Sequence, residues 1–296
     1  MNISLKNKKK LILGTAQFKK NYGKSQFNNL HSKEIKEILE FAYQNQIIEL
    51  DTAPDYGDSE IQIGQAQTKH LITSKIPSHK DLSISFADWI EASIHKTLLN
   101  TKRKSIETIL FHNPHEFIAN YSHEVNEKIS SIKEMGLIKN AGISVYETRE
   151  VDQILEIFKP DILQFPLNPF DQRFLENNKL KDIRSLGIET IARSIFLQGV
   201  LVSENLKDKE YFQRWDQDFS QWRDYCKSKN LKPYEACISF ILGIDSLDGY
   251  TLGVGSLKEL QEIASAIKML DISSNLFVNK NFQNQDIDLI DPRRWP

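Results

Sequence analysis

The stretch TILFHNPHEFIANYSHEVNEKISSIKEMGLIKNAGIS, residues 108–144, contains two short apolar runs with a helical pattern between them. Residues 108–112 and 140–144 are short and rich in apolar side chains, which is typical of strands buried in a parallel sheet. Between them, residues 122–135 have the length and apolar spacing of an amphipathic helix. A strand, a helix and a strand in this order form the βαβ unit from which parallel sheets are built.

The same alternation continues outward from this stretch in both directions. Six further strands are predicted at residues 11–14, 47–51, 71–75, 162–165, 189–192 and 250–253. Further helices are predicted at residues 32–43, 87–99, 148–158, 173–186, 233–242 and 256–269, with an added helical lid or flank at residues 203–229. Eight strand–helix units in a chain of this length close into a (β/α)8 TIM barrel. The sequence therefore predicts the α/β class, with a single barrel domain over residues 1–296.

The composition of the 296 residues excludes several classes of protein. Hydrophobic residues make up 40% and charged residues 26%, which is typical of a folded globular domain. The net charge of -2 offers no positive field for nucleic acid. The sequence has neither a secretion signal nor an apolar run that could span a membrane, and its two cysteines are too few for a disulfide framework. We expect a cytoplasmic protein with no nucleic-acid or membrane partner.

Polar side chains end three consecutive predicted strands: Asp51, Lys75 and His112. In a parallel barrel the carboxyl ends of the strands meet at one mouth, where active sites lie. Tyr56 follows Asp51 in a turn-forming loop and can fold back over this mouth. Considered alone, each side chain has a structural explanation as part of an ion pair, a loop aromatic or a strand cap. Their coincidence at one mouth favours a reactive site.

The charges of these residues predict how the phenol behaves. A neighbouring ammonium group stabilises a phenolate, so we expect Lys75 to lower the pKa of Tyr56. Asp51 would hold Lys75 charged and in place. Tyr56 would then act as a proton donor near neutral pH.

The motif DTAPDYGDSE, residues 51–60, with Lys75 in segment 73–75 and His112 in segment 111–114, resembles the catalytic tetrad of the aldo/keto reductase family. Similarity to the family continues in residues 13–18, 22–23, 92–94, 136–144 and 164–168. The resemblance implies an NAD(P)H-dependent oxidoreductase that reduces a small aldehyde, ketone or sugar carbonyl to an alcohol. It implies Tyr56 as the general acid and His112 as the residue that orients the carbonyl, both aimed at the developing oxyanion.

The resemblance also implies where the cofactor, NADP or NAD, binds. Ser144 and Gln164 are similar to the residues that hold its carboxamide. The other implied cofactor-binding residues are Gly14, Thr15, Arg193, Ser194, Gly199, Gly253, Gly255, Ser256 and Glu262. No Gly-x-Gly-x-x-Gly follows an early strand, so the barrel itself must hold the dinucleotide. The loops at 192–199 and 253–256 offer a phosphate site, although the second is equally consistent with a plain strand-to-helix turn.

The cofactor positions depart from the family pattern in several places. Gly253, Glu259 and Ile263 stand where NADP-selective members carry basic residues and an Asn. The carboxylate of Glu259 would repel a 2′-phosphate unless Lys258 compensates for it. Arg193 stands where the family often stacks an aromatic ring on the nicotinamide, and a guanidinium plane can stack there instead. Val145 replaces the usual Asn after the carboxamide-binding serine. NADP and NAD therefore both stay open as cofactors.

Two other functions are consistent with the same barrel. One is a non-catalytic or regulatory NAD(P)-binding barrel. The other is a metal-dependent hydrolase, suggested by segment 112–115, HNPH, which lacks the His-x-His pattern and further ligands of such a site. The reductase hypothesis requires no metal. The aromatic residues Phe18, Trp215 and Trp222 are explained equally by pocket lining and by helix packing.

Overall fold

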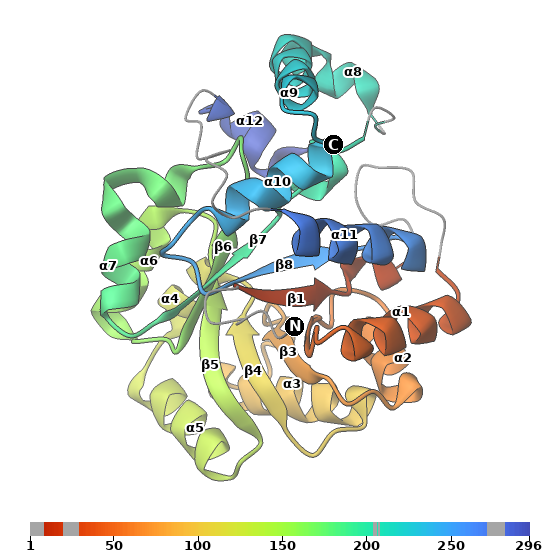
Figure 1. Ribbon diagram of the computed structural model, residues 1–296. Helices are drawn as coiled ribbons and strands as arrows, with labels where there is room; N and C mark the ends of the chain where they lie inside the picture. The colour runs from red at the N-terminus through yellow and green to blue at the C-terminus, as the bar shows by residue number, and fades with distance from the viewer. Residues whose placement is uncertain (1–8, 20–29, 204–205, 207, 271–281) are drawn as a thin grey trace.

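Eight parallel strands close into a barrel in the order in which they occur along the chain. The structure is a computed structural model that describes residues 9–19, 30–203, 206, 208–270 and 282–296. The strands are β1 Lys10–Gly14, β2 Glu49–Asp51, β3 Leu71–Ile76, β4 Ile106–Phe111, β5 Ile138–Ser144, β6 Ile162–Pro166, β7 Glu189–Arg193 and β8 Gly249–Gly253. β1 pairs with both β2 and β8, which closes the barrel (Figure 1). The predicted (β/α)8 barrel is confirmed.

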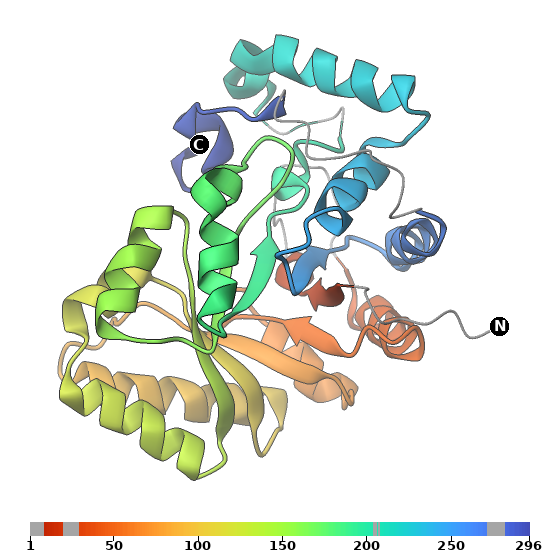
Figure 2. The same ribbon diagram turned by 60° about the vertical axis from the view of Figure 1, so that its left-hand side comes forward.

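Helices between the strands form the outer layer (Figures 1 and 2). Six of them match predicted helices: α1 Ser32–Gln44, α3 Phe86–Thr101, α5 His123–Glu134, α6 Thr148–Ile157, α10 Pro233–Leu242 and α11 Leu257–Met269. Side-chain caps fix several of their starts, since Ser85, Ser122 and Ser256 each accept a backbone N–H of the first turn. Each helix then turns its apolar stripe toward the strands.

Some elements differ from the predictions. The predicted helix at residues 173–186 is two elements, the 3-10 helix η2 Arg173–Asn178 and α7 Lys179–Ser185. The chain breaks there because Asn177 and Asn178 adopt positive φ angles of 51° and 58°, which asparagine tolerates better than most residues. Three short α-helices were not predicted, α2 Ser59–Ala66, α4 Pro114–Asn120 and α12 Ile287–Ile290. β4 ends at Phe111, so His112 follows the strand, and its N–H donates to the carbonyl of Ile76.

The helical flank predicted at residues 203–229 consists of α8 Lys209–Phe212, η4 Gln213–Trp215 and α9 Asp216–Ser228. It packs against the C-terminal segment, which contains α12 Ile287–Ile290 and η6 Pro292–Arg294, as both ribbon views show. Trp215 donates its ring N–H to Asp286 over 3.0 Å, and Trp222 donates to the carbonyl of Leu201 over 2.9 Å. Phe18, Trp215 and Trp222 are buried, so their packing explanation holds.

The barrel interior changes character along its axis. A small apolar cluster of Ile12, Leu110, Ile162 and Ile191 fills its middle. At the amino ends of the strands, Lys10 forms ion pairs of 2.8 Å with both Glu49 and Glu189. Polar side chains gather at the opposite end, where the short 3-10 helices η1 Ala16–Phe18 and η3 Leu197–Gly199 follow β1 and β7. This end holds the cavity described below.

No helix in the described part of the chain combines the length and the apolar character needed to cross a bilayer. Tyr22 and Gly23, which contribute to the family resemblance, lie outside the described residues.

Candidate active site

A cavity of about 350 Å³ opens at the carboxyl ends of the strands. Asp51, Tyr56, Lys75 and His112 all line it. Asp51 ends β2, Lys75 lies in β3, and Tyr56 and His112 follow β2 and β4. Adjacent strands pair in parallel, and this pairing brings residues from three separate stretches of the chain to one mouth.

Asp51 and Lys75 form a buried ion pair at the base of the cavity. Nζ of Lys75 lies 2.5 Å from Oδ1 of Asp51, and the two side chains are 1% and 5% exposed. Lys75 also donates to the carbonyl of Thr52 over 3.0 Å, and Nε2 of Gln164 donates to the other carboxylate oxygen of Asp51. Because both charges are out of water, this network holds each side chain in one position.

Tyr56 is partly buried in the loop after β2, where its N–H closes a turn on the carbonyl of Ala53. Nζ of Lys75 lies 5.1 Å from the centre of its ring. Burial raises the pKa of Tyr56 well above its usual value, the carboxylate of Asp51 raises it further, and Arg193 opposes both. The expected lowering of this pKa is therefore wrong, because burial and the carboxylate of Asp51 together outweigh the positive charge beside the phenol. The phenol is fully protonated at neutral pH.

His112 contacts a carboxylate that the sequence analysis did not assign. Its Nδ1 lies 3.2 Å from Oδ2 of Asp55, the residue just before Tyr56. Its ring meets that of Tyr56 edge to face, with 6.4 Å between centroids. Burial lowers the pKa of His112, and the charges of Lys75 and Arg193 lower it further, while Asp55 opposes the shift. The position of Asp55 inside the motif at residues 51–60 was the one feature of the sequence that could have identified it as a site residue.

Arg193, at the end of β7, also lines the cavity. Its Nε donates to Oγ of Ser144 over 3.2 Å, and its terminal nitrogens donate to Ser194 and to the carbonyl of Val145. Its guanidinium lies 4.0 Å over the ring of Tyr146, a lining residue that the sequence analysis missed. Among the described residues, the hydrogen-bond partners of Arg193 are two hydroxyls and a carbonyl, and none is a carboxylate. The positive charge of Arg193 is therefore not neutralised by a direct partner and makes the electrostatic potential of the cavity more positive.

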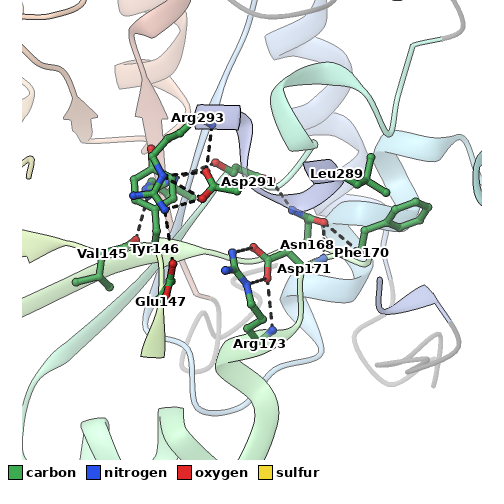
Figure 3. Close-up of polar contacts among 12 residues, drawn as sticks. Val145, Tyr146, Glu147, Asn168, Phe170, Asp171, Arg173, Leu289, Asp291 and Arg293 are labelled. Carbon is green, nitrogen blue, oxygen red and sulfur yellow. Dashed lines mark hydrogen bonds and ion pairs between the residues drawn. The ribbon is translucent and has the colours of Figure 1, made fainter. Parts of the chain in front are cut away.

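The C-terminal segment completes this side of the cavity. Figure 3 shows Arg293 beside Tyr146 and Asp291, with Glu147 below them. The guanidinium of Arg293 lies 3.7 Å from the centre of the Tyr146 ring and 2.5 Å from Oδ2 of Asp291. Pro292, which lies between Asp291 and Arg293 in the sequence, lines the cavity. The contacts fix the end of the chain over the loop that follows β5.

Most of the residues predicted to bind the cofactor lie in this cavity: Gly14, Ser144, Gln164, Arg193, Ser194, Gly199, Gly253 and Glu262. Thr15, Gly255 and Ser256 do not line it. Thr15 is buried and donates to the carbonyl of Asp51 over 3.0 Å. Gly255 donates its N–H to Glu259 over 2.7 Å, and Ser256 caps α11.

Several cavity residues have free capacity for hydrogen bonds, as a polar ligand requires. Oε1 of Gln164, Oε1 of Gln17 and Oγ1 of Thr251 are buried without a partner among the described residues, and all three residues line the cavity. The amide group of Gln164 contacts Asp51, which places Gln164 beside the predicted catalytic residues. The two amide oxygens can accept hydrogen bonds from the NH2 of a carboxamide or from ribose hydroxyls, and the Thr251 hydroxyl can donate one or accept one. The residues present therefore fit a nicotinamide dinucleotide.

The two histidines of segment 112–115 are not brought together. His112 contacts Asp55, whereas Nε2 of His115 lies 3.1 Å from the buried carboxylate of Glu150. Within the part of the chain that the structure describes, no group of three or more His, Cys, Asp or Glu side chains could hold a metal ion.

Residues 10–277 match the model of the aldo/keto reductase family. D-arabinose 1-dehydrogenase of Saccharomyces cerevisiae is 22% identical over 306 residues, covering 92% of this chain and 87% of that protein. Aldo-keto reductase family 1 member A1 of Cricetulus griseus is 22% identical over 188 residues, 54% of this chain. The chain spans only 57% of the length of this second relative.

Two solved structures have the same fold. An aldo-keto reductase from Bacillus halodurans in its holo form gives a TM-score of 0.74 at 15% identity, covering 92% of this chain and 90% of that one. A glycerol dehydrogenase from Gluconobacter oxydans gives a TM-score of 0.67 at 16% identity, with 87% and 86% covered. At these identities the similarity establishes the fold alone.

Proposed function

Since the chain belongs to the aldo/keto reductase family, we propose that it reduces the carbonyl group of a small aldehyde or ketone to an alcohol with NADH or NADPH. The observation that carries this proposal is the meeting of Asp51, Tyr56, Lys75 and His112 in one cavity, with a protonated phenol among them.

Tyr56 is the general acid in this proposal. The reduced nicotinamide, when bound, supplies the hydride that reaches the carbonyl carbon. As negative charge develops on the oxygen, the phenol of Tyr56 gives it a proton, because an alkoxide is a stronger base than a phenolate. The resulting phenolate is stabilised by the positive charge of Arg193, which lines the same cavity. The high pKa of the resting phenol keeps the proton in place until the reaction begins.

Ser144 and Gln164 would hold the carboxamide of the cofactor. The family resemblance supports this assignment, and so does the buried, unpartnered Oε1 of Gln164. Its Nε2 donates to Asp51, so the side chain is fixed with one end on the ion pair. Gly253 would contribute through its position in the cavity wall, where the absence of a Cβ leaves room for the side chain of Gln17.

A binding titration followed by an activity screen tests the proposal. Quenching of the protein's tryptophan and tyrosine fluorescence by NADH and by NADPH measures affinity without turnover. Oxidation of the tighter-binding nucleotide is then followed with a panel of aldehydes and ketones. The proposal predicts binding and turnover. A protein that binds either nucleotide but reduces no member of the panel would instead be the regulatory barrel.

A further inference from the structure

The ring of Tyr146 lies between two guanidinium groups. The guanidinium carbon of Arg193 lies 4.0 Å from the centre of the ring, and that of Arg293 lies 3.7 Å from it. Non-bonded carbon atoms pack at about 3.5 Å, so each group must lie almost directly over the ring centre. One face has room for only one such group, and the two therefore stack on opposite faces. Figure 3 shows the Arg293 side of this stack.

Asp291 holds Arg293 in place against the ring. Its carboxylate accepts a hydrogen bond from Nε of Arg293 over 2.9 Å and another from a terminal nitrogen over 2.5 Å. A pair with two parallel hydrogen bonds fixes the plane of the guanidinium as well as its position. The side chain of Asp291 is only 3% exposed, so its charge depends on this partner. The C-terminal segment thus presents a fixed planar cation to Tyr146.

The position of Arg193, on the other face of the ring, affects two groups in the cavity. Its charge opposes the rise in the pKa of Tyr56 and contributes to the lowering of the pKa of His112. Its hydrogen bonds go to two hydroxyls and a carbonyl, which anchor a guanidinium less firmly than a carboxylate does. The stack on Tyr146 is therefore an important part of what keeps Arg193 in the cavity.

We propose that Arg293 is a positioning residue, which holds the guanidinium of Arg193 in the cavity through the ring of Tyr146. Arg293 is not one of the described residues that line the cavity, so it acts on the site only through this ring. Its effect on the reaction rests on the proposed function, in which Arg193 stabilises the phenolate that forms when Tyr56 gives up its proton. The last turn of the chain is then part of what makes the site reactive.

A double-mutant cycle separates positioning from a general effect on stability. The readout is the pKa of His112, measured by NMR without nucleotide. Asp55 and Lys75 also face this ring, and every variant retains both. Arg293→Met should raise the pKa, by less than Arg193→Gln does, because a loosened Arg193 disfavours the imidazolium less. In a protein that already carries Arg193→Gln, Arg293→Met should raise it no further.

Two more variants complete the design. Arg294→Met is the matched control, since Arg294 is the next residue, pairs with Asp288 over 3.2 Å and does not line the cavity. It should leave the pKa of His112 unchanged. Tyr146→Leu repeats the cycle without leaving the carboxylate of Asp291 unpaired, and it should again raise the pKa only where Arg193 is present.

An equal rise with and without Arg193 would show that Arg293 acts through its own charge or through packing, and would overturn the inference. An unchanged pKa in Arg293→Met would overturn it as well. With a carbonyl compound that is reduced, Arg293→Met should lower kcat by about threefold or more where Arg193 is present and leave it unchanged in Arg193→Gln. If no compound is reduced but the cycle gives the expected pattern, the proposed function is wrong and the positioning role of Arg293 stands.

Discussion

The ammonium group of Lys75 lies 2.5 Å from the carboxylate of Asp51, in side chains that are almost completely buried. Each charge is therefore tolerated in the barrel only because the other is present. Removing one partner of such a pair leaves an uncompensated charge out of water, whereas replacing both removes the need for compensation.

We predict that Lys75→Met lowers the free energy of unfolding by about 3–5 kcal/mol. The double variant Asp51→Asn, Lys75→Met should lose clearly less, because the unpaired carboxylate is gone. Urea unfolding of the two variants beside the unsubstituted protein measures both values. Equal losses in the single and double variants would show that the two charges do not depend on each other.

The pKa of His112 should respond in opposite directions to two substitutions. Arg193 disfavours the imidazolium, so Arg193→Gln should raise the pKa, while Asp55 favours it, so Asp55→Asn should lower the pKa. The other charged group that faces this ring is Lys75, which both variants retain. NMR titration of the His112 ring without nucleotide measures the shifts. Movement of the pKa in the same direction in both variants would refute this description of the cavity.

Glu259 should disfavour NADPH relative to NADH. Its carboxylate lines the cavity beside Glu262 and already occupies the N–H of Gly255, a donor that a phosphate could have used. Among the described residues it has no ion-pair partner. Two like charges about 4 Å apart repel by several kcal/mol in a protein environment, so Glu259→Lys should shift the ratio of dissociation constants toward NADPH by about tenfold or more.

Fluorescence titration of both nucleotides gives these dissociation constants. Glu156→Lys changes the net charge equally at an exposed position of α6, and it should leave the ratio unchanged. If Glu156→Lys shifts the ratio of dissociation constants as much as Glu259→Lys does, the shift is caused by the net charge of the protein and the prediction for Glu259 is wrong.

Much of the fold could be predicted because its signals are local. Short apolar runs alternate with amphipathic segments, and a parallel barrel is the arrangement that buries both. The break at Asn177 and Asn178 could not be predicted this way, since it depends on two backbone angles that the apolar pattern does not reveal. The helices α2 and α4 are too short for their spacing of apolar residues to be distinguished from loops.

The position of the cavity was also predictable, since Asp51, Lys75 and His112 lie at or just after the carboxyl ends of neighbouring strands. The pairs Asp55–His112 and Arg193–Tyr146 were not, because each joins loops that are far apart in the sequence. The direction of the Tyr56 pKa shift depends on how deeply the phenol is buried and on how close Asp51 and Arg193 lie to it. Neither quantity can be read from spacing alone.

The most direct measurement compares nucleotide oxidation by Tyr56→Phe with that by the unsubstituted protein, using the best carbonyl compound from the screen. Loss of the proton donor should lower kcat by about 10²- to 10⁴-fold while the dissociation constant of the nucleotide stays nearly the same. Tyr121→Phe, which removes a phenol packed against Phe117 and Phe158 outside the cavity, should keep the original rate. Unchanged turnover in Tyr56→Phe would contradict the account.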